Sequence, residues 1–204
     1  LQRLVVNGQS LTAYRSSPEH AFGPAPGSFA YRFERLAEEM TGVAHVIACS
    51  SGTMALWAGL QFLAPKGSRV ITSPYTFSAT PASIQLAGYQ PIFADVGWSP
   101  VGCVDPLEVS KLAATLVVPV DLFGAVATRE CGGRLILADS CQAVGAYRGM
   151  QNARVAVWSM NGQKNVPAGE AGAVLTDDPD LADRIRKFIS HGENWSDPVV
   201  GTNG

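Results

Sequence analysis

One lysine of the chain lies where a reactive amine could be placed. Lys164 sits in the stretch SMNGQKNVPAGEAG (159–172), which is rich in small residues and lies between two apolar, strand-like runs. The other lysines, in helix-like stretches or at a turn, are Lys66, Lys111 and Lys187. A lysine in a loop is usually a solvated surface charge. Beside small residues, however, its amine can reach a bound group and act as a nucleophile.

Two further features could do chemistry, and both follow strand-like runs. SSGT (50–53) connects the apolar run HVIAC to a helix-like stretch, so its backbone N–H groups and the helix dipole could bind a phosphate. Asp139 ends the apolar run LILAD, where a carboxylate must be paired, hydrogen-bonded or directed into a cleft. Each has an ordinary alternative: SSGT can be a simple helix N-cap, and Asp139 a capping or turn residue.

Together the three features match the needs of pyridoxal 5'-phosphate (PLP). Its aldehyde forms a Schiff base with a lysine, a carboxylate keeps its pyridine nitrogen protonated, and its phosphate is anchored at a helix start. An aromatic ring completes such a site, and SPYTFSAT (73–80) supplies Tyr75 and Phe77 after a strand-like run. The sequence lacks G-x-G-x-x-G, G-x-x-x-x-G-K-[ST], H-E-x-x-H and any C-x-x-C pair, so dinucleotide, P-loop and metal sites have no motif.

The elements that position these residues alternate between strand and helix. Strands are expected over 45–49, 69–73, 90–96, 116–120, 134–139, 154–160 and 171–177, and helices over 29–41, 54–64, 80–88, 105–115 and 178–191. Several strands are continuous apolar runs, which predicts a three-layer αβα fold with a mostly parallel central sheet. Ligands of such sheets bind at the carboxyl ends of the strands, where the three features lie. In the first helix, one face carries Phe29, Phe33, Leu36 and Met40.

Composition limits the class of protein. The 204 residues are 47% hydrophobic and 16% charged, which is typical of a globular chain with ample core. The net charge is −2 and no basic block stands out, so we expect no nucleic-acid or membrane partner. No apolar run approaches the roughly 18–20 residues of a membrane span, and the N-terminus has too short an apolar core for a secretory signal. We expect a cytoplasmic protein with four reduced cysteines.

Six stretches, in order, resemble the DegT-type nucleotide-sugar aminotransferases, which are fold-type I PLP enzymes related to aspartate aminotransferase. They are CSSGTMAL, SPYTFSATPASIQLAGYQPIFADV, VVPVDLFG, LADSCQAVGA, SMNGQKNVPAGEAGAV and ISHGENW. The resemblance covers about residues 30–195. It implies an irregular N-terminal segment (1–28), a PLP-binding large domain (29–195) and a tail (196–204). The smaller C-terminal domain of the family is absent from these residues.

The resemblance implies a role for each site residue. Lys164 would be the Schiff-base lysine and would later move the proton, and Asp139 would pair with the pyridine nitrogen. The other positions implied to bind the cofactor are Gly52, Thr53 and Ser159 at the phosphate, Phe77 on the ring face and Gln142 beside the ring.

The chain also departs from the pattern of the family. Ala138 replaces a glutamate, and GEAG (169–172) replaces the common GEGG. The stretch between Gly124 and Leu135 looks shorter than usual, so we expect it to lack a helix.

The implied function is a PLP-dependent aminotransferase that converts a nucleotide-linked keto sugar to an amino sugar, with glutamate as the amino-acid donor. Because the small domain is missing, the alternative is a non-catalytic interaction or regulatory protein with the same fold. A family member acting on a non-sugar ketone is a third option. A homodimer would close the cofactor site. The aromatic residues that could lie at its interface, or be ordinary core, are Trp57, Phe62, Tyr75 and Trp195.

Overall fold

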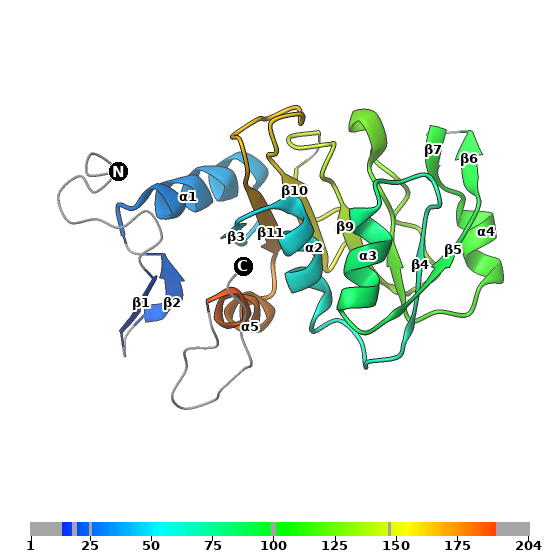
Figure 1. Cartoon of the computed structure of the whole chain (residues 1–204), viewed down its shortest axis with the longest axis horizontal. Coiled ribbons are helices and arrows are strands. Elements are labelled where there is room, and N and C mark those ends of the chain that lie inside the picture. Colours follow the sequence, from blue (N-terminus) through cyan, green and yellow to red (C-terminus); the bar gives the residue numbers. More distant parts are fainter. Residues whose placement is uncertain (1–13, 18–19, 25, 99–100, 147, 191–204) are drawn as a thin grey trace.

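The centre of the molecule is a seven-stranded sheet (Figure 1). The computed structural model describes residues 14–17, 20–24, 26–98, 101–146 and 148–190. In their order across the sheet, the strands are β3 (His45–Cys49), β11 (Gly172–Thr176), β10 (Val155–Ser159), β9 (Leu135–Asp139), β8 (Leu116–Val118), β4 (Arg69–Thr72) and β5 (Gln90–Phe93). Every neighbouring pair is parallel except those of β11, which runs antiparallel to both β10 and β3. The mostly parallel α/β fold is confirmed.

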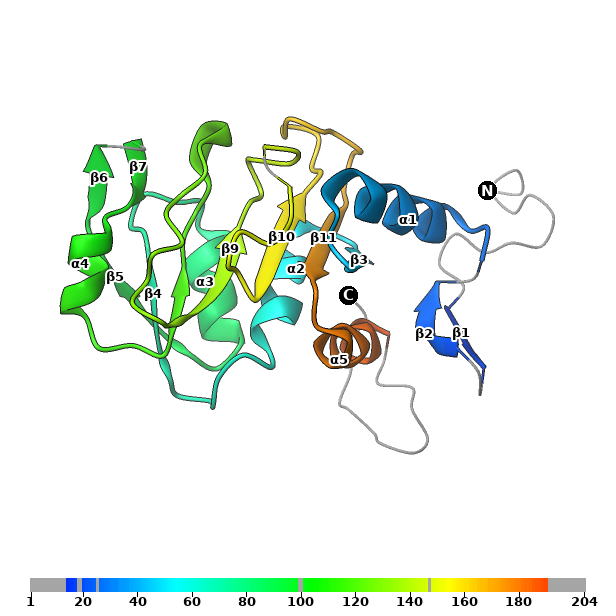
Figure 2. The same cartoon turned by 180° about the vertical axis from the view of Figure 1, so that it is seen from behind.

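Helices cover both faces of the sheet. They are α1 (Phe29–Thr41), α2 (Gly52–Leu60), α3 (Ala79–Leu86), α4 (Pro106–Lys111) and α5 (Pro179–Ile189). One face packs against α2, α3 and α5 through an apolar core. On the other face, α1 and α4 lie toward opposite ends of the sheet (Figure 2). Two connecting segments contribute Cys131, Met150 and Ala153 to the core between them.

The connection from β8 to β9 contains no crossover helix. After β8 the chain forms a short 3₁₀ turn, η2 (Leu122–Gly124), and then runs irregularly to Leu135. The absence of a helix between Gly124 and Leu135, expected from the sequence, is confirmed.

Capping residues place the helix starts close to their expected positions. The side chains of Ser28, Asp105 and Asp178 accept hydrogen bonds from backbone N–H groups in the first turns of α1, α4 and α5. Helices α2 and α4 end four residues earlier than the sequence predicts, at Leu60 and Lys111. Helix ends carry a weaker sequence signal than helix centres, because the apolar repeat gives no sharp boundary.

Two antiparallel hairpins differ from the sequence expectation. The segment expected to be irregular contains β1 (Tyr14–Ser17) paired with β2 (His20–Pro24). After β5, β6 (Val96–Trp98) pairs with β7 (Val101–Val104). Strands this short show little periodic alternation, and backbone groups make their pairing, so the sequence pattern did not reveal them.

Much of the apolar face of α1 points away from the sheet. Phe29, Leu36 and Met40 are more than half exposed, and the helix instead buries Glu34 against the sheet. Both Glu34 oxygens accept hydrogen bonds from Arg186 of α5, at 3.0 and 2.9 Å. A buried carboxylate requires such a partner, so this ion pair fixes which side of α1 faces inward.

Two of the four candidate interface aromatics, Trp57 and Phe62, are partly buried and pack against the core. Trp57 and Phe62 pack edge-on against Phe188, with ring centroids 5.2 and 6.0 Å apart. Tyr75 is exposed, and Trp195 lies outside the described residues.

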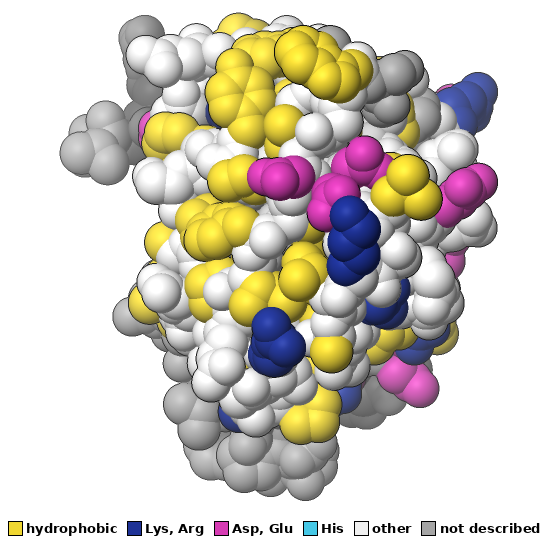
Figure 3. All heavy atoms as spheres, turned by 90° about the vertical axis from the view of Figure 1, so that its right-hand side faces the viewer, with side chains coloured by type: hydrophobic (Ala, Val, Ile, Leu, Met, Phe, Trp, Pro, Cys, Tyr) yellow, Lys and Arg dark blue, Asp and Glu magenta, His cyan; other side chains and the backbone are white. Residues whose placement is uncertain are grey.

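Apolar side chains also gather on the side of the molecule formed by β5, β6 and α4 (Figure 3). Trp98 is the most exposed of them. Within the described residues, no helix is both long and apolar enough to cross a membrane.

Candidate functional site

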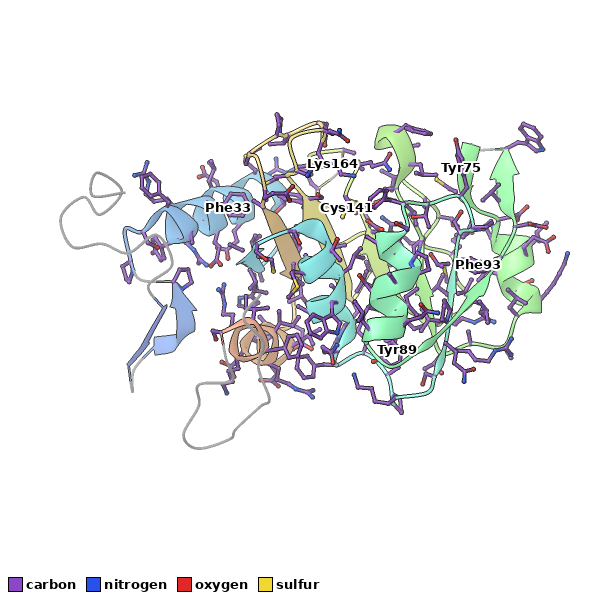
Figure 4. The ribbon with its side chains drawn as sticks, in the orientation of Figure 1. Phe33, Tyr75, Tyr89, Phe93, Cys141 and Lys164 are labelled. Carbon is purple, nitrogen blue, oxygen red and sulfur yellow. The ribbon has the colours of Figure 1, made fainter. Side chains whose placement is uncertain are left out.

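All the residues predicted to form the site line one cavity. It has a volume of about 1000 Å³ and lies at the carboxyl ends of the parallel strands. The predicted residues that line it are Gly52, Thr53, Phe77, Asp139, Gln142, Ser159 and Lys164. They follow or end β3, β4, β9 and β10, so the parallel sheet brings together positions that are far apart in the sequence. Lys164 and Cys141 lie at this edge of the sheet in Figure 4.

Lys164 lies in the loop between β10 and β11. Backbone hydrogen bonds close this loop: Gly162 donates to Gly169 and Lys164 donates to Asn161, at 2.8 and 2.9 Å. The Lys164 amine lies 5.9 Å from the centre of the Phe77 ring. Among the described residues, no carboxylate lies within ion-pair distance of this amine. Lys164 therefore lines the cavity with an amine that no acidic side chain of the described residues pairs with.

Asp139 ends β9 with its carboxylate almost fully buried, at 4% exposure. One oxygen accepts a hydrogen bond from the Thr80 hydroxyl at 2.6 Å, and the other accepts from the Cys141 backbone N–H at 3.2 Å. The carboxylate thus has the hydrogen bonds that a buried charge needs. It can also accept from a donor in the cavity, because two carboxylate oxygens offer about four acceptor positions.

The start of α2 forms the end of the cavity next to β10. Ser51 caps the helix by accepting from the Met54 N–H at 3.2 Å, and the first turn contains no acidic residue. A Cβ on Gly52 would lie 2.6 Å from the Cβ of Ser159, so only glycine lets the helix start pack this closely on β10. The free N–H groups of this turn and the Ser159 hydroxyl are donors that suit an anion.

Gly172, the first residue of β11, also packs closely against the backbone at the start of α2. A Cβ there would lie 2.3 Å from the Ser51 carbonyl oxygen and 2.7 Å from the Gly52 nitrogen. The sequence pattern showed Gly172 only as the last residue of GEAG and predicted no role for it. A glycine after a reactive loop indicates close backbone approach, but the element that approaches cannot be read from the sequence.

Gln142 and Phe123 line the cavity side by side. The Gln142 side-chain oxygen accepts a hydrogen bond from the Phe123 N–H at 3.2 Å. Phe123 has a left-handed backbone with φ of 53°, and its ring lies edge-on to Tyr75 at 6.4 Å. Sequence reasoning missed Phe123, although VVPVDLFG was among the motifs, because nothing in its residue types indicated chemistry.

Cys141 lines the cavity next to Asp139. Burial, and after it the negative charge of Asp139, raises the pKa of the Cys141 thiol well above its ordinary value of 9.0. The thiol therefore stays protonated. All four cysteines are free, and no group of side chains within the described residues could hold a metal ion.

The chain is similar to known proteins that are considerably longer than it is. The chain is 31% identical to a GDP-perosamine synthase of Caulobacter vibrioides and to a pleiotropic regulatory protein of Geobacillus stearothermophilus, each over 87% of its length. It spans about half of these curated relatives, 53% and 52%.

Solved structures agree with this relationship. The NtdA protein of Bacillus subtilis with bound cofactor PMP aligns with a TM-score of 0.80 and 26% identity. The alignment covers 99% of this chain and 47% of that one. The model of the DegT/DnrJ/EryC1/StrS aminotransferase family matches residues 13–204, and the chain therefore belongs to this PLP-dependent family.

Proposed function

We propose that the chain forms the PLP-binding part of an aminotransferase that acts on a nucleotide-linked keto sugar, with glutamate as the amino donor. The observation that carries the proposal is the Lys164 amine. It faces a cavity that also contains a buried carboxylate, Asp139, and an uncharged helix start at Gly52. The nucleotide sugar is favoured because a curated relative is named as a GDP-perosamine synthase.

The residues of the cavity fit PLP in their chemistry. Because Gly52 has no side chain, the start of α2 packs closely against Ser159. The backbone N–H groups of this helix start and the Ser159 hydroxyl then lie together as hydrogen-bond donors for a phosphate. Asp139 is an acceptor for a protonated ring nitrogen. Phe77 and Gln142 lie on the walls where a flat ring can be held.

PLP supplies an electron sink that lowers the cost of removing a proton from an amino acid. The residues of the chain bind it, orient it and move that proton. Gly52, Thr53 and Ser159 would hold the phosphate, Phe77 would pack on the ring, and Asp139 would accept from the ring nitrogen. Lys164 Nζ would bind the cofactor and would take and return the proton of the amino acid.

The experiment is exchange of the glutamate Cα proton in D₂O, followed by proton NMR with the PLP-loaded chain. This step requires only the small amino donor, so it does not depend on contacts to the sugar. We expect exchange in the wild type and in Lys111→Ala, whose lysine lies in an exposed ion pair on α4, and none in Lys164→Ala. Binding of PLP without exchange would favour the non-catalytic alternative, which the regulatory relative supports.

We propose in addition that the protein is a cytoplasmic homodimer. Phe77 and Phe123 line the cavity, Tyr75 packs edge-on against Phe123, and all three side chains are more than half exposed. Exposed aromatic side chains grouped in this way usually mark an interface. A second subunit, related by two-fold symmetry, would cover these side chains.

The chain alone should then turn over keto sugar weakly, because water reaches the cofactor. A monomer at micromolar concentration in light scattering, with full aminotransferase activity, would contradict the dimer.

A further inference from the structure

The carboxylate of Asp139 is held by a hydroxyl group from a neighbouring helix. Thr80 lies in the first turn of α3, is 1% exposed, and reaches Asp139 Oδ2 at 2.6 Å. Its hydroxyl also lies 2.8 Å from that of Thr76, which lines the same cavity. In helices, a threonine hydroxyl commonly bonds to a carbonyl of its own preceding turn, whereas this one is directed across to β9.

The direction of these hydrogen bonds follows from the chemistry of the groups. An ionised carboxylate only accepts, so the Thr80 hydroxyl donates its single proton to Asp139. The Thr80 oxygen must then accept from Thr76, which is the donor of that pair. The Cys141 N–H occupies the other carboxylate oxygen at 3.2 Å. Both oxygens of Asp139 are therefore fixed by donors, which stabilise its charged form and its orientation.

We propose that Thr80 is a positioning residue that aims the Asp139 carboxylate at the ring nitrogen of PLP, with Thr76 polarising the Thr80 hydroxyl. This inference rests on the proposed function, because it assigns a partner to Asp139. Thr80 lines the cavity as well, but its hydroxyl proton is directed to Asp139, so the role assigned to it is exerted through that carboxylate. Nothing in the sequence pattern separated Thr80 from the other residues of the TPASIQLAG helix.

The experiment compares binding of PLP with binding of its analogue in which carbon replaces the ring nitrogen. Only PLP can interact with Asp139 through that nitrogen, so the ratio of the two dissociation constants isolates this contact. We expect Thr80→Val to reduce the preference for PLP by about tenfold, the size of one charge-assisted hydrogen bond. Thr80→Ser keeps the hydroxyl and should keep the preference.

Thr72→Val is the matched control. Thr72 is also fully buried, and its hydroxyl donates to the Val118 carbonyl at 2.9 Å, away from Asp139. This variant loses the same atoms, so it should lose stability while keeping the preference for PLP. If Thr80 served only in packing, Thr80→Val would weaken the binding of PLP and of the analogue equally. The ratio of their dissociation constants would then be unchanged, and this result would overturn the inference.

A second measurement uses the protein without cofactor. The Thr80 hydroxyl oxygen lies 2.6 Å from an oxygen of a buried carboxylate, so its proton should exchange slowly and proton NMR should show a Thr80 hydroxyl signal. It should shift in Asp139→Asn and stay in Thr72→Val. If the signal is missing or insensitive to Asp139→Asn, the inference fails while the proposed function stands. If it is present but the wild type does not prefer PLP over the analogue, the role proposed for Asp139 fails and the inference falls with it.

Discussion

Replacing Gly172 with alanine should displace the start of α2 and damage the cofactor cradle. The new Cβ would lie 2.3 Å from the Ser51 carbonyl oxygen and 2.4 Å from its carbon. Ordinary contact begins at 3.4 Å, so one backbone must move by about 1 Å. Both are backbone segments of regular elements, β11 and α2, and neither can turn aside as a flexible side chain could.

The expected cost in the free energy of unfolding is about 1–3 kcal/mol, as for overpacking elsewhere in protein cores. Alanine restricts the unfolded chain more than glycine does, and this effect offsets roughly 0.4–1 kcal/mol of that loss of stability. Each kcal/mol of net loss lowers Tm by about 2–4 °C in a chain of this length. PLP affinity should fall as well, because the N–H groups at Gly52 move with the helix start.

Gly97→Ala in β6 provides the control, because Gly97 does not line the cavity. A Cβ there meets only Asp105, at 3.8 Å, so unfolding and PLP binding should both stay close to those of the wild type. Urea unfolding and a PLP titration followed by absorbance measure the two effects. If Gly172→Ala unfolds and binds PLP as the wild type does, the close approach of β11 to the start of α2 is wrong.

Three further predictions concern the ion pair, the thiols and the carboxylate. Arg186→Met should cost about 3–5 kcal/mol in urea unfolding, because it leaves Glu34 buried without its partner; Lys111→Ala, which breaks an exposed pair, should change little. Burial raises the pKa of the Cys49 thiol from 9.0 to about 12. The unfolded thiol therefore ionises first, and stability should fall as pH rises from 9 toward 12, less steeply in Cys49→Ala. Asp139→Asn should retain PLP but lose most glutamate Cα exchange, and exchange at the wild-type rate would remove Asp139 from the site.

The strands and the position of the cavity could be predicted from the sequence because their signal is local. Apolar runs such as HVIAC and LILAD require a buried sheet, and parallel pairing then places the residues after Cys49 and at Asp139 on one edge. Lys164 was recognisable because a lysine between two buried strands is unusual. These inferences need only residue types, their order and the rule that ligands bind at strand ends.

The remaining contacts depend on partners that are distant in the chain. Thr80 is separated from Asp139 by 59 positions, and Gly172 meets the start of α2 only after β11 inserts between β3 and β10. The apolar face of α1 is exposed because Glu34 finds Arg186, 152 positions away. Neither periodicity nor composition encodes such pairs, so the roles of Thr80 and Gly172 became visible only in the folded chain.

We propose above that the Lys164 amine is the group that binds PLP. The direct measurement is to incubate the protein with PLP, reduce with borohydride, digest and locate the pyridoxyl group by mass spectrometry. The site described here predicts one labelled peptide, containing Lys164, and no label on that peptide in a Lys164→Ala variant. A label on Lys66, Lys111 or Lys187 in its place would contradict the assignment.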